Sequence, residues 1–223
     1  MANRYDARAM AKRAEYLGPE RRRPLVLDAA LEIFADGGFS DASMQAIADR
    51  AGVSKAVLYD CFPGGKQEIY NALLERGEQT FMEHMTQALG RTARLPVDEG
   101  LELGISSFLE YAELHPHSFR VIFGDVGTRD LDVIKSAERT RERMIELLTA
   151  RTRDVMRRSG VDQSPIFDFF PRAIVAVSEE MARWLIRMPD VAREPAVQVV
   201  VMWMMKGFEK LIPNEAWRGT RPV

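Results

Sequence analysis

Apolar residues recur at intervals of three and four along most of the chain, a spacing typical of amphipathic α-helices. No segment shows the strict alternation of apolar and polar residues that indicates a strand. The first apolar stripe lies in residues 26–34, and we expect its helix to open at Pro24 and to end at Gly37-Gly38. The pattern therefore predicts an all-α protein.

Two short helices are predicted next, each with its own start and stop signals. Ser43 is a suitable N-cap for the first helix, and Gly52 ends it. Ser54 then caps a second helix over residues 55–62, which Pro63 terminates. The two helices are thus separated by a tight turn.

Six further helices follow from the same spacing, which gives about nine in total. They span residues 66–89, 96–114, 118–123, 130–158, 166–188 and 195–211. Pro171 lies near the start of the fifth of these, as a helix start or a kink. Gly77 lies on the apolar stripe of the first, where the missing side chain permits a close approach.

The last predicted helix contains seven consecutive apolar residues, from Val199 to Met205. A helix that is apolar on all sides must be buried on all sides. Burial against a second copy of the chain is the simplest solution, because a homodimer interface resembles a protein core. The residues predicted for this dimer interface are Trp184, Val200, Trp203, Met204 and Phe208.

Residues 43–62 carry the pattern that points to a function. A helix-turn-helix needs two short helices that cross at a steep angle and are joined by a tight turn. Ala48 and Ala51 are small enough for a close crossing, and Gly52 supplies the turn. An ordinary helical hairpin is the alternative interpretation. The apolar residues with the spacing to fill the small core are Ile47, Val53, Leu58 and Phe62.

The stretch of residues 25–74 resembles the DNA-binding domain of the TetR (tetracycline-repressor-like) family of transcriptional regulators. The matching residues are Ala29 to Phe34, Gly38, Phe39, Ser43, Ile47, Ala48, Ala51 to Ser54, Leu58, Tyr59 and Phe62 to Lys66. The resemblance implies a homodimeric repressor that a small molecule releases from its operator DNA. It also implies an N-terminal three-helix DNA-binding domain followed by a helical domain for ligand binding and dimerisation.

The resemblance assigns Ser43, Tyr59 and Lys66 to phosphate contacts, which fix the register on DNA without reading its sequence. Gln45 and Lys55 are the candidates for base contacts, because both side chains can donate to purine acceptors. We therefore expect double-stranded operator DNA as a partner.

Two positions of the second short helix depart from the family pattern. Val57 replaces a common threonine and offers only an apolar contact, for example to a thymine methyl group. Asp60 replaces a more usual aromatic, histidine or basic residue, so its carboxylate points aside, caps a neighbour or accepts from cytosine. The complete set of predicted DNA-binding residues is Ser43, Gln45, Ser54, Lys55, Ala56, Val57, Tyr59, Asp60 and Lys66.

Composition adds a compartment and a domain division. The 223 residues carry a net charge of −2, so any basic surface that faces DNA must be local. No apolar run approaches the ~20 residues that cross a bilayer, the N-terminus has no apolar signal stretch, and the single cysteine fits a reducing cytoplasm. We expect a cytoplasmic protein without membrane association, divided into a basic arm (1–22), a helix-turn-helix domain (23–66) and a helical domain (67–223).

The basic arm has two open interpretations. Residues 1–23 hold seven Lys or Arg against three Asp or Glu, which suits a flexible arm that reads a minor groove. A solvated, frayed extension has the same composition. The sequence does not choose between the two.

The helical domain is expected to hold a pocket for a small apolar or amphipathic effector, as helical bundles often do. Each candidate residue has an alternative role in core or dimer packing, where methionine fills irregular gaps. The candidate lining residues are Phe81, Met85, Phe108, Tyr111, Phe123, Met144, Phe170, Met181 and Trp184.

No metal or cofactor is predicted. His115 and His117 lie close in sequence but lack the spacing of known metal sites, so His115-Pro116 is better interpreted as a helix-breaking turn. Cys61 has no second cysteine to resolve an oxidised state. Two other classes compete with the regulator: an enzyme, for which we find no catalytic motif, and a helical carrier or interaction module that has lost DNA binding.

Overall fold

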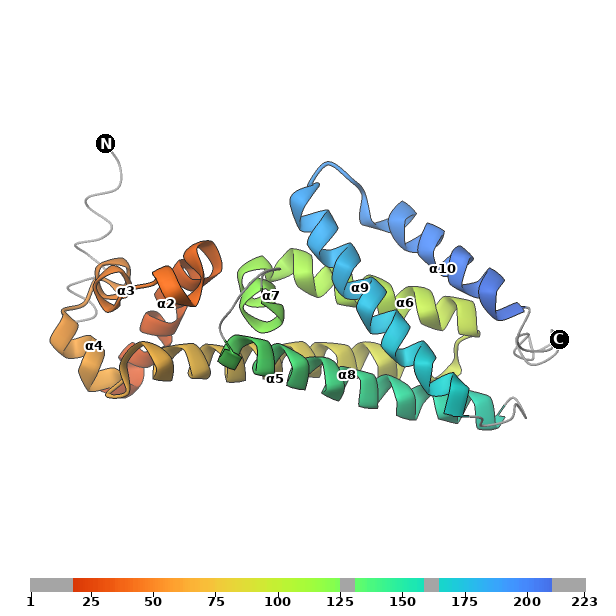
Figure 1. Cartoon of the computed structure of the whole chain (residues 1–223), viewed down its shortest axis with the longest axis horizontal. Coiled ribbons are helices and arrows are strands. Elements are labelled where there is room, and N and C mark those ends of the chain that lie inside the picture. The colour runs from red at the N-terminus through yellow and green to blue at the C-terminus, as the bar shows by residue number, and fades with distance from the viewer. Residues whose placement is uncertain (1–17, 125–130, 159–164, 210–223) are drawn as a thin grey trace. The chain divides into compact units, whose positions relative to one another are not determined.

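The computed structural model describes residues 18–124, 131–158 and 165–209. These residues form nine α-helices and two short 3-10 helices and contain no strand (Figure 1). The all-α prediction and the expected number of helices are confirmed. The elements are α2 (Pro19–Asp41), α3 (Met44–Ala51), α4 (Lys55–Cys61), α5 (Gly65–Arg91), η1 (Thr92–Arg94), α6 (Val97–Leu114), α7 (Pro116–Phe123), α8 (Leu131–Arg158), η2 (Pro165–Asp168), α9 (Phe169–Arg187) and α10 (Arg193–Glu209).

The start of α2 is the one boundary that departs from the prediction by more than a turn. The helix begins at Pro19, with Gly18 as its N-cap, so Pro24 lies inside the helix and does not open it. Pro19 suits the first helical position because its missing N–H would have no helical partner there. At the other end Gly38 leaves the helical conformation with φ 72° and ψ 176°, which confirms the predicted break.

Contacts between residues divide the chain into two compact units. The first, which we call the head, consists of Met1–Gln79 and His117–Glu138. The second, the body, consists of Thr80–Pro116 and Arg139–Val223. The helices α5 and α8 contribute residues to both units. The division predicted at residues 66 and 67 falls in the first turn of α5.

The head has its own apolar core, formed by α2, α3, α4, α7 and the first part of α5. Tyr70 of α5 packs edge-on against Phe34 and Phe39, with ring centroids 5.1 and 5.0 Å apart. At Gly77 the helices α5 and α7 approach closely, because a side chain there would lie 2.9 Å from the side chain of Ile122. The small residue expected to allow close packing thus does so against α7.

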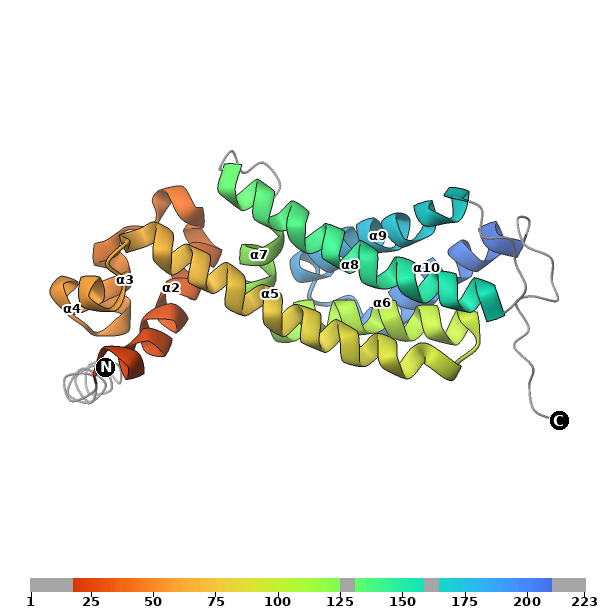
Figure 2. The ribbon, with the colours of Figure 1, turned by 90° about the horizontal axis from the view of Figure 1, so that it is seen from below.

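The body is built around α6, which packs against both α9 and α10 (Figure 2). The end of α5 also packs against α6. Phe81 of α5 contacts Phe108 and Tyr111 of α6 edge-on, with ring centroids 5.3 and 5.1 Å apart. A ring nitrogen of His84 lies 2.9 Å from the carbonyl oxygen of Ser107. These contacts hold the end of α5 against α6 within the body.

Candidate functional site

The helices α3 and α4 form the predicted helix-turn-helix, and its caps have the expected geometry. The Oγ of Ser43 accepts from the backbone N–H of Ala46 at 3.1 Å, and the Oγ of Ser54 accepts from that of Val57 at 3.3 Å. Gly52 ends α3 in the left-handed region with φ 67°, a conformation that glycine adopts without strain. Side-chain caps and one glycine therefore define both helices and the turn between them.

The core of this helix pair is also as predicted. Ile47, Leu58 and Phe62 have no exposed surface, and Ala48 is fully buried at the crossing of the two helices. Val53 is half-buried against the same core. The apolar plugs leave the opposite face of α4 to solvent, which is the face that a recognition helix presents to a groove.

The predicted DNA-binding residues divide by exposure. Val57 and Lys66 are half-buried, and Val57 packs against the head core, so its contribution to a DNA surface is limited. Gln45 is exposed and donates to Asp49 at 2.7 Å. The contacts of all these predicted residues with DNA stay predictions. The exposed members of the set are Ser43, Gln45, Ser54, Lys55, Ala56, Tyr59 and Asp60.

Lys66 has internal partners in this structure. Its Nζ donates to the carbonyl oxygens of Phe39, Ser40 and Ala42 at 2.7, 3.4 and 3.0 Å. The ammonium group also lies 4.4 Å from the centroid of the Phe39 ring. Lys66 therefore holds the last turn of α2 and its C-cap Ala42, and a phosphate contact would compete with these three carbonyl groups.

Arg23 has a structural role that the sequence did not reveal. Its Nη1 donates to the carbonyl oxygen of Cys61, the last residue of α4, at 2.5 Å. The guanidinium lies 4.2 Å from the centroid of the Phe62 ring and pairs with Glu68 at 3.4 Å. The start of α2 is thereby tied to the end of the recognition helix. Of the predicted basic arm, residues 1–17 lie outside the described residues.

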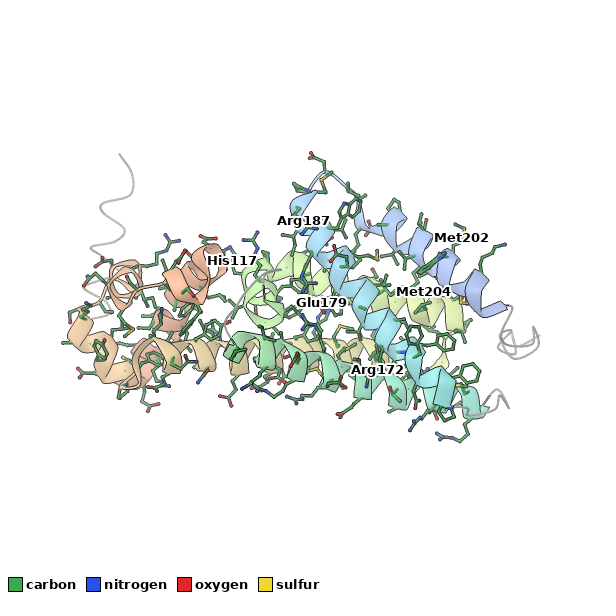
Figure 3. The ribbon with its side chains drawn as sticks, in the orientation of Figure 1. His117, Arg172, Glu179, Arg187, Met202 and Met204 are labelled. Atoms are coloured by element: carbon green, nitrogen blue, oxygen red, sulfur yellow. The ribbon has the colours of Figure 1, made fainter. Side chains whose placement is uncertain are left out.

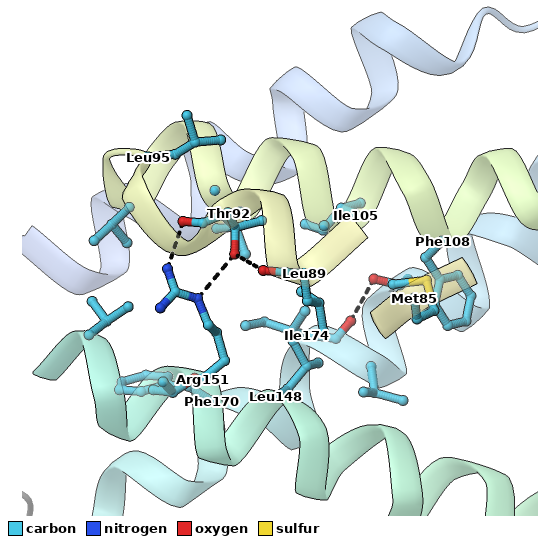
Figure 4. Close-up of a pocket in the computed structure, with 18 of the residues that line it drawn as sticks. Met85, Leu89, Thr92, Leu95, Ile105, Phe108, Leu148, Arg151, Phe170 and Ile174 are labelled. Carbon is cyan, nitrogen blue, oxygen red and sulfur yellow. Dashed lines mark hydrogen bonds between the residues drawn. The ribbon is translucent and has the colours of Figure 1, made fainter. Parts of the chain in front are cut away.

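The body contains a cavity of about 150 Å³, surrounded by α5, η1, α6, α8, η2 and α9 (Figure 4). A dry apolar cavity of about this size can hold a molecule such as benzene. The lining residues are Met85, Leu89, Thr92, Leu95, Pro96, Val97, Gly100, Leu101, Gly104, Ile105, Phe108, Met144, Leu148, Arg151, Thr152, Val155, Met156, Phe167, Phe170, Ile174, Val175 and Ser178.

Arg151 is the one charged residue among those that line this cavity. Its Nη2 donates to the carbonyl oxygen of Thr92 at 2.6 Å, and its Nε donates to the Oγ1 of Thr92 at 3.1 Å. Its Nη1 donates to Asp154 at 3.1 Å. Burial lowers the pKa of the Arg151 guanidinium from its ordinary value, and the nearby Asp154 carboxylate opposes that shift. Arginine nevertheless stays charged at neutral pH.

Four of the nine predicted pocket residues line this cavity: Met85, Phe108, Met144 and Phe170. Phe81 and Tyr111 are buried in the aromatic cluster with Phe108 and do not reach it. The remaining three also lie outside the lining. Phe123 belongs to the head, Met181 is half-buried on α9, and Trp184 is exposed on α9.

The sequence did contain a signal for Arg151. It lies three residues after Leu148 and four before Val155, so it shares the apolar stripe of α8. A charge within such a stripe is unusual enough to mark a position of interest. The predicted lining residues were all aromatic residues or methionines, so Arg151 was not among them.

The helix α10 has an exposed apolar face in the single chain. Val199, Met202 and Trp203 are each about 60% exposed or more, whereas Met204 is buried within the body. Figure 3 shows Met202 and Met204 on opposite sides of α10. Trp184 on α9 is also exposed, and Val200 is half-buried. The side chain of Phe208 lies outside the described part of the structure. The helix is therefore not buried on all sides by its own chain.

The residues considered for metal and membrane roles have ordinary surroundings. The ring of His115 packs against Tyr111, with centroids 4.9 Å apart. Within the described ranges no group of three or more His, Cys, Asp or Glu could hold a metal ion. No helix in those ranges has the length and apolar character needed to cross a membrane. Cys61 is buried at the end of α4.

Comparison with known proteins places this geometry among DNA-binding regulators. The model of the family described as bacterial regulatory proteins, tetR family, matches residues 26–73, which contain the helix-turn-helix. The HTH-type transcriptional activator FasR of Mycolicibacterium smegmatis is 29% identical over 198 residues. That match covers 88% of this chain and 87% of FasR, so the likeness extends beyond the head.

Solved structures show the same fold over most of the chain. A TetR-like transcriptional regulator from Rhodococcus sp. RHA1 is 26% identical with a TM-score of 0.66, and the match covers 84% of this chain and 95% of that one. The regulator FadR from Bacillus subtilis, solved in complex with stearoyl-CoA, has a TM-score of 0.66 at 17% identity. That match covers 81% of this chain and 95% of FadR, and it is a likeness of fold.

Proposed function

Because the chain belongs to the TetR family of bacterial transcriptional regulators, we propose that it is a homodimer that binds a specific operator and releases it when a small amphipathic molecule occupies the body. The chain is thus a transcription regulator and not an enzyme. The observation that carries the proposal is the coexistence of a capped, exposed recognition helix in the head and an apolar cavity in the body.

The recognition helix α4 is proposed to enter the major groove through Lys55, Ala56 and Tyr59. These side chains are exposed, and Arg23 and Leu58 hold the helix from behind through the Cys61 carbonyl and the head core. The exposed hydroxyl groups of the two N-cap serines add donors toward phosphates. The head therefore offers direct base contacts and register-fixing contacts from the same small surface.

A second copy of the chain is the proposed occupant of the exposed apolar face on α9 and α10. Large exposed apolar residues that gather on one surface mark an interaction site rather than ordinary surface. A twofold dimer buries the same patch on both subunits and presents two recognition helices to a palindromic operator. The proposed interface takes in the exposed residues Trp184 of α9, Met188 directly after it, and Val199, Met202 and Trp203 of α10.

The effector is proposed to bind in the body cavity with an apolar tail inside. The wall is almost entirely apolar, which favours a hydrocarbon group over a polar molecule. The neighbour FadR, which shares the fold, was solved with stearoyl-CoA, a molecule that joins a hydrocarbon tail to a polar head. An acyl-type ligand therefore suits both the cavity of this chain and the fold.

Release of the operator is proposed to follow from a shift between two conformations of the dimer. A ligand shifts that equilibrium only if it binds one conformation more tightly than the other. The factor by which bound ligand lowers the affinity for DNA equals the factor by which bound DNA lowers the affinity for the ligand. The helices α5 and α8 have residues in both the head and the body and are the proposed connection. An operator that overlaps a promoter makes the protein a repressor, although the relative FasR is named an activator.

Fluorescence anisotropy of labelled upstream DNA tests the proposal. We expect tight binding that weakens steeply as the salt concentration rises, because binding releases counterions from DNA. Lys55→Ala should lower the affinity by at least tenfold, whereas Lys135→Ala removes the same charge from an exposed position on α8 and should leave it unchanged. Equal effects of the two variants, or binding no better than to random DNA, would favour a carrier or interaction module.

A further inference from the structure

The wall of the body cavity is mostly apolar, and Arg151 is the one charged residue among those that line it. Figure 4 shows Arg151 and Thr92 on the side of the drawn pocket away from Phe108 and Met85. Thr92 is itself buried, and its Oγ1 donates to the carbonyl oxygen of Leu89 at 2.8 Å. A molecule in this cavity would therefore meet mostly hydrocarbon and, beside Thr92, a guanidinium group.

Arg151 is more than a plug for the cavity, because an apolar side chain would close the same space without the cost of desolvating a charge. Asp154, its one anionic partner among the described residues, is shared. The carboxylate of Asp154 also pairs with Arg157 at 2.8 Å and with Arg158 at 2.7 Å. Arg151 therefore shares this carboxylate with two other guanidinium groups.

Arg151 also has donors to spare. A guanidinium group has five N–H donors, and the three contacts with Thr92 and Asp154 take one from Nε and one from each terminal nitrogen. Each terminal nitrogen keeps one N–H without a partner among the described residues. Such donors suit a carbonyl or carboxylate oxygen, to which charge-assisted hydrogen bonds are strong.

We propose that Arg151 selects the effector by binding an oxygen of its acyl head, a carboxylate or a thioester carbonyl, while the tail fills the apolar cavity. This inference rests on the proposed function, since it concerns the ligand of the same cavity. The cavity volume corresponds to a tail on the order of six carbon atoms. Flexible methionine side chains in the wall allow somewhat longer tails.

The competing explanation is that Arg151 only fastens α8 to η1. A purely structural role would alter the binding of all ligands of the cavity together. Head recognition would alter only ligands with an acyl oxygen. Two probes of equal chain length, octanoate and 1-octanol, separate the two explanations, and octanoyl-CoA tests the thioester form.

The experiment is calorimetric titration of the full-length protein with each probe. Arg151→Met removes the charge at similar length, and Arg151→Lys keeps the charge but loses the fork of donors. The matched control is Arg153→Met, which removes an exposed charge two residues away that pairs with Asp168 at 2.7 Å. DNA anisotropy on every variant reports whether head and dimer stay intact.

We expect Arg151→Met to lower the affinity for octanoate or octanoyl-CoA by about tenfold to a hundredfold and to leave the affinity for 1-octanol unchanged. If the affinity falls for octanoate alone, the effector is a free acid. If the affinity for octanoyl-CoA falls, the effector is a thioester. Arg151→Lys should show a smaller loss of the same kind, which carries the test if Arg151→Met does not fold. Arg153→Met should behave as the parent protein.

An unchanged ratio of acyl to alcohol affinity in both Arg151 variants would overturn the proposal, as would a parent protein that binds all three probes equally. Those results leave the proposed function standing if any probe still lowers DNA affinity. Failure of the proposed function looks different. The parent protein would then bind no operator, or its DNA affinity would not respond to bound ligand.

Discussion

Arg141 of α8 and Glu179 of α9 form a two-pronged ion pair inside the body. The Nε and Nη2 of Arg141 donate to the two carboxylate oxygens of Glu179 at 2.7 and 2.5 Å. Arg183, one turn further along α9, also pairs with this carboxylate. Glu179 is only 4% exposed, so one buried carboxylate holds two guanidinium groups and joins the two helices (Figure 3).

Glu179→Gln should therefore destabilise the protein strongly. It removes the buried carboxylate charge that both Arg141 and Arg183 contact, and breaking a buried ion pair typically costs about 3–5 kcal/mol. The pair of Glu142 with Arg172 also joins α8 to α9 at 2.9 Å, but it lies in solvent, so Glu142→Gln serves as the control and should change little. Urea unfolding of the three proteins measures the difference. Similar midpoints for the two variants would contradict the inferred importance of burial.

The close approach of α5 and α7 predicts opposite effects at two glycines of one helix. Gly77→Ala would place a Cβ 2.9 Å from the Ile122 side chain and from the Oγ of Ser118, and overpacking of this kind costs about 1–3 kcal/mol. Gly90→Ala meets nothing within 4 Å and should stabilise the helix by up to about 1 kcal/mol. Thermal unfolding should give shifts of opposite sign. Stabilisation by both substitutions would show that the head relaxes around position 77.

The exposed face of α10 predicts a change of oligomeric state. Trp203→Glu places a charge in the proposed interface and should give a monomer, because an unpaired charge buried in an apolar contact is costly. Leu114→Glu introduces the same charge at another exposed apolar residue of the body and should leave the dimer intact. Light scattering after size-exclusion chromatography reports the mass. A dimeric Trp203→Glu protein would place the interface elsewhere.

The buried thiol of Cys61 predicts a loss of stability in alkaline solution. Burial raises the pKa of this thiol above 9.0, its ordinary value, although Arg22 and Arg23 oppose the shift. The unfolded chain then releases the proton at a lower pH than the folded chain. The contribution is complete below the pKa of the unfolded thiol and is lost as the pH rises through that of the folded thiol.

The free energy of unfolding should accordingly fall more steeply from about pH 8 to about pH 10 in the parent protein than in Cys61→Ala. The comparison uses slopes, so the packing lost with the thiol does not enter. Urea unfolding at a series of pH values provides the measurement. Parallel slopes would mean that burial does not perturb this thiol.

The local structure of the head could be predicted from sequence because its signals are local. The N-cap of Ser43, the left-handed Gly52 and the core position of Leu58 each depend on a few neighbouring residues. The predicted start of α2 was wrong because two prolines, Pro19 and Pro24, suit a first helical turn. Nothing nearby in the sequence indicates which of the two begins the helix.

The destinations of long side chains could not be predicted in the same way. Lys66 has the composition of a phosphate contact, but its carbonyl partners come from residues more than twenty positions earlier. Arg23 and Arg151 likewise depend on partners 38 and 59 residues away. Which aromatic residues and methionines line the cavity also depends on packing between helices. Met85 reaches it, whereas Phe81, one turn earlier on α5, does not.

The caps of α3 and α4 have a consequence for the kinetics of operator binding. Ser43 and Ser54 use an oxygen lone pair to accept the capping bond, so each hydroxyl hydrogen stays available to a phosphate. Both helices are therefore already capped at their N-termini in the absence of DNA, and the turn does not have to become ordered when DNA binds. Association should be governed by diffusion and charge steering, and sequence discrimination should appear mainly as differences in residence time.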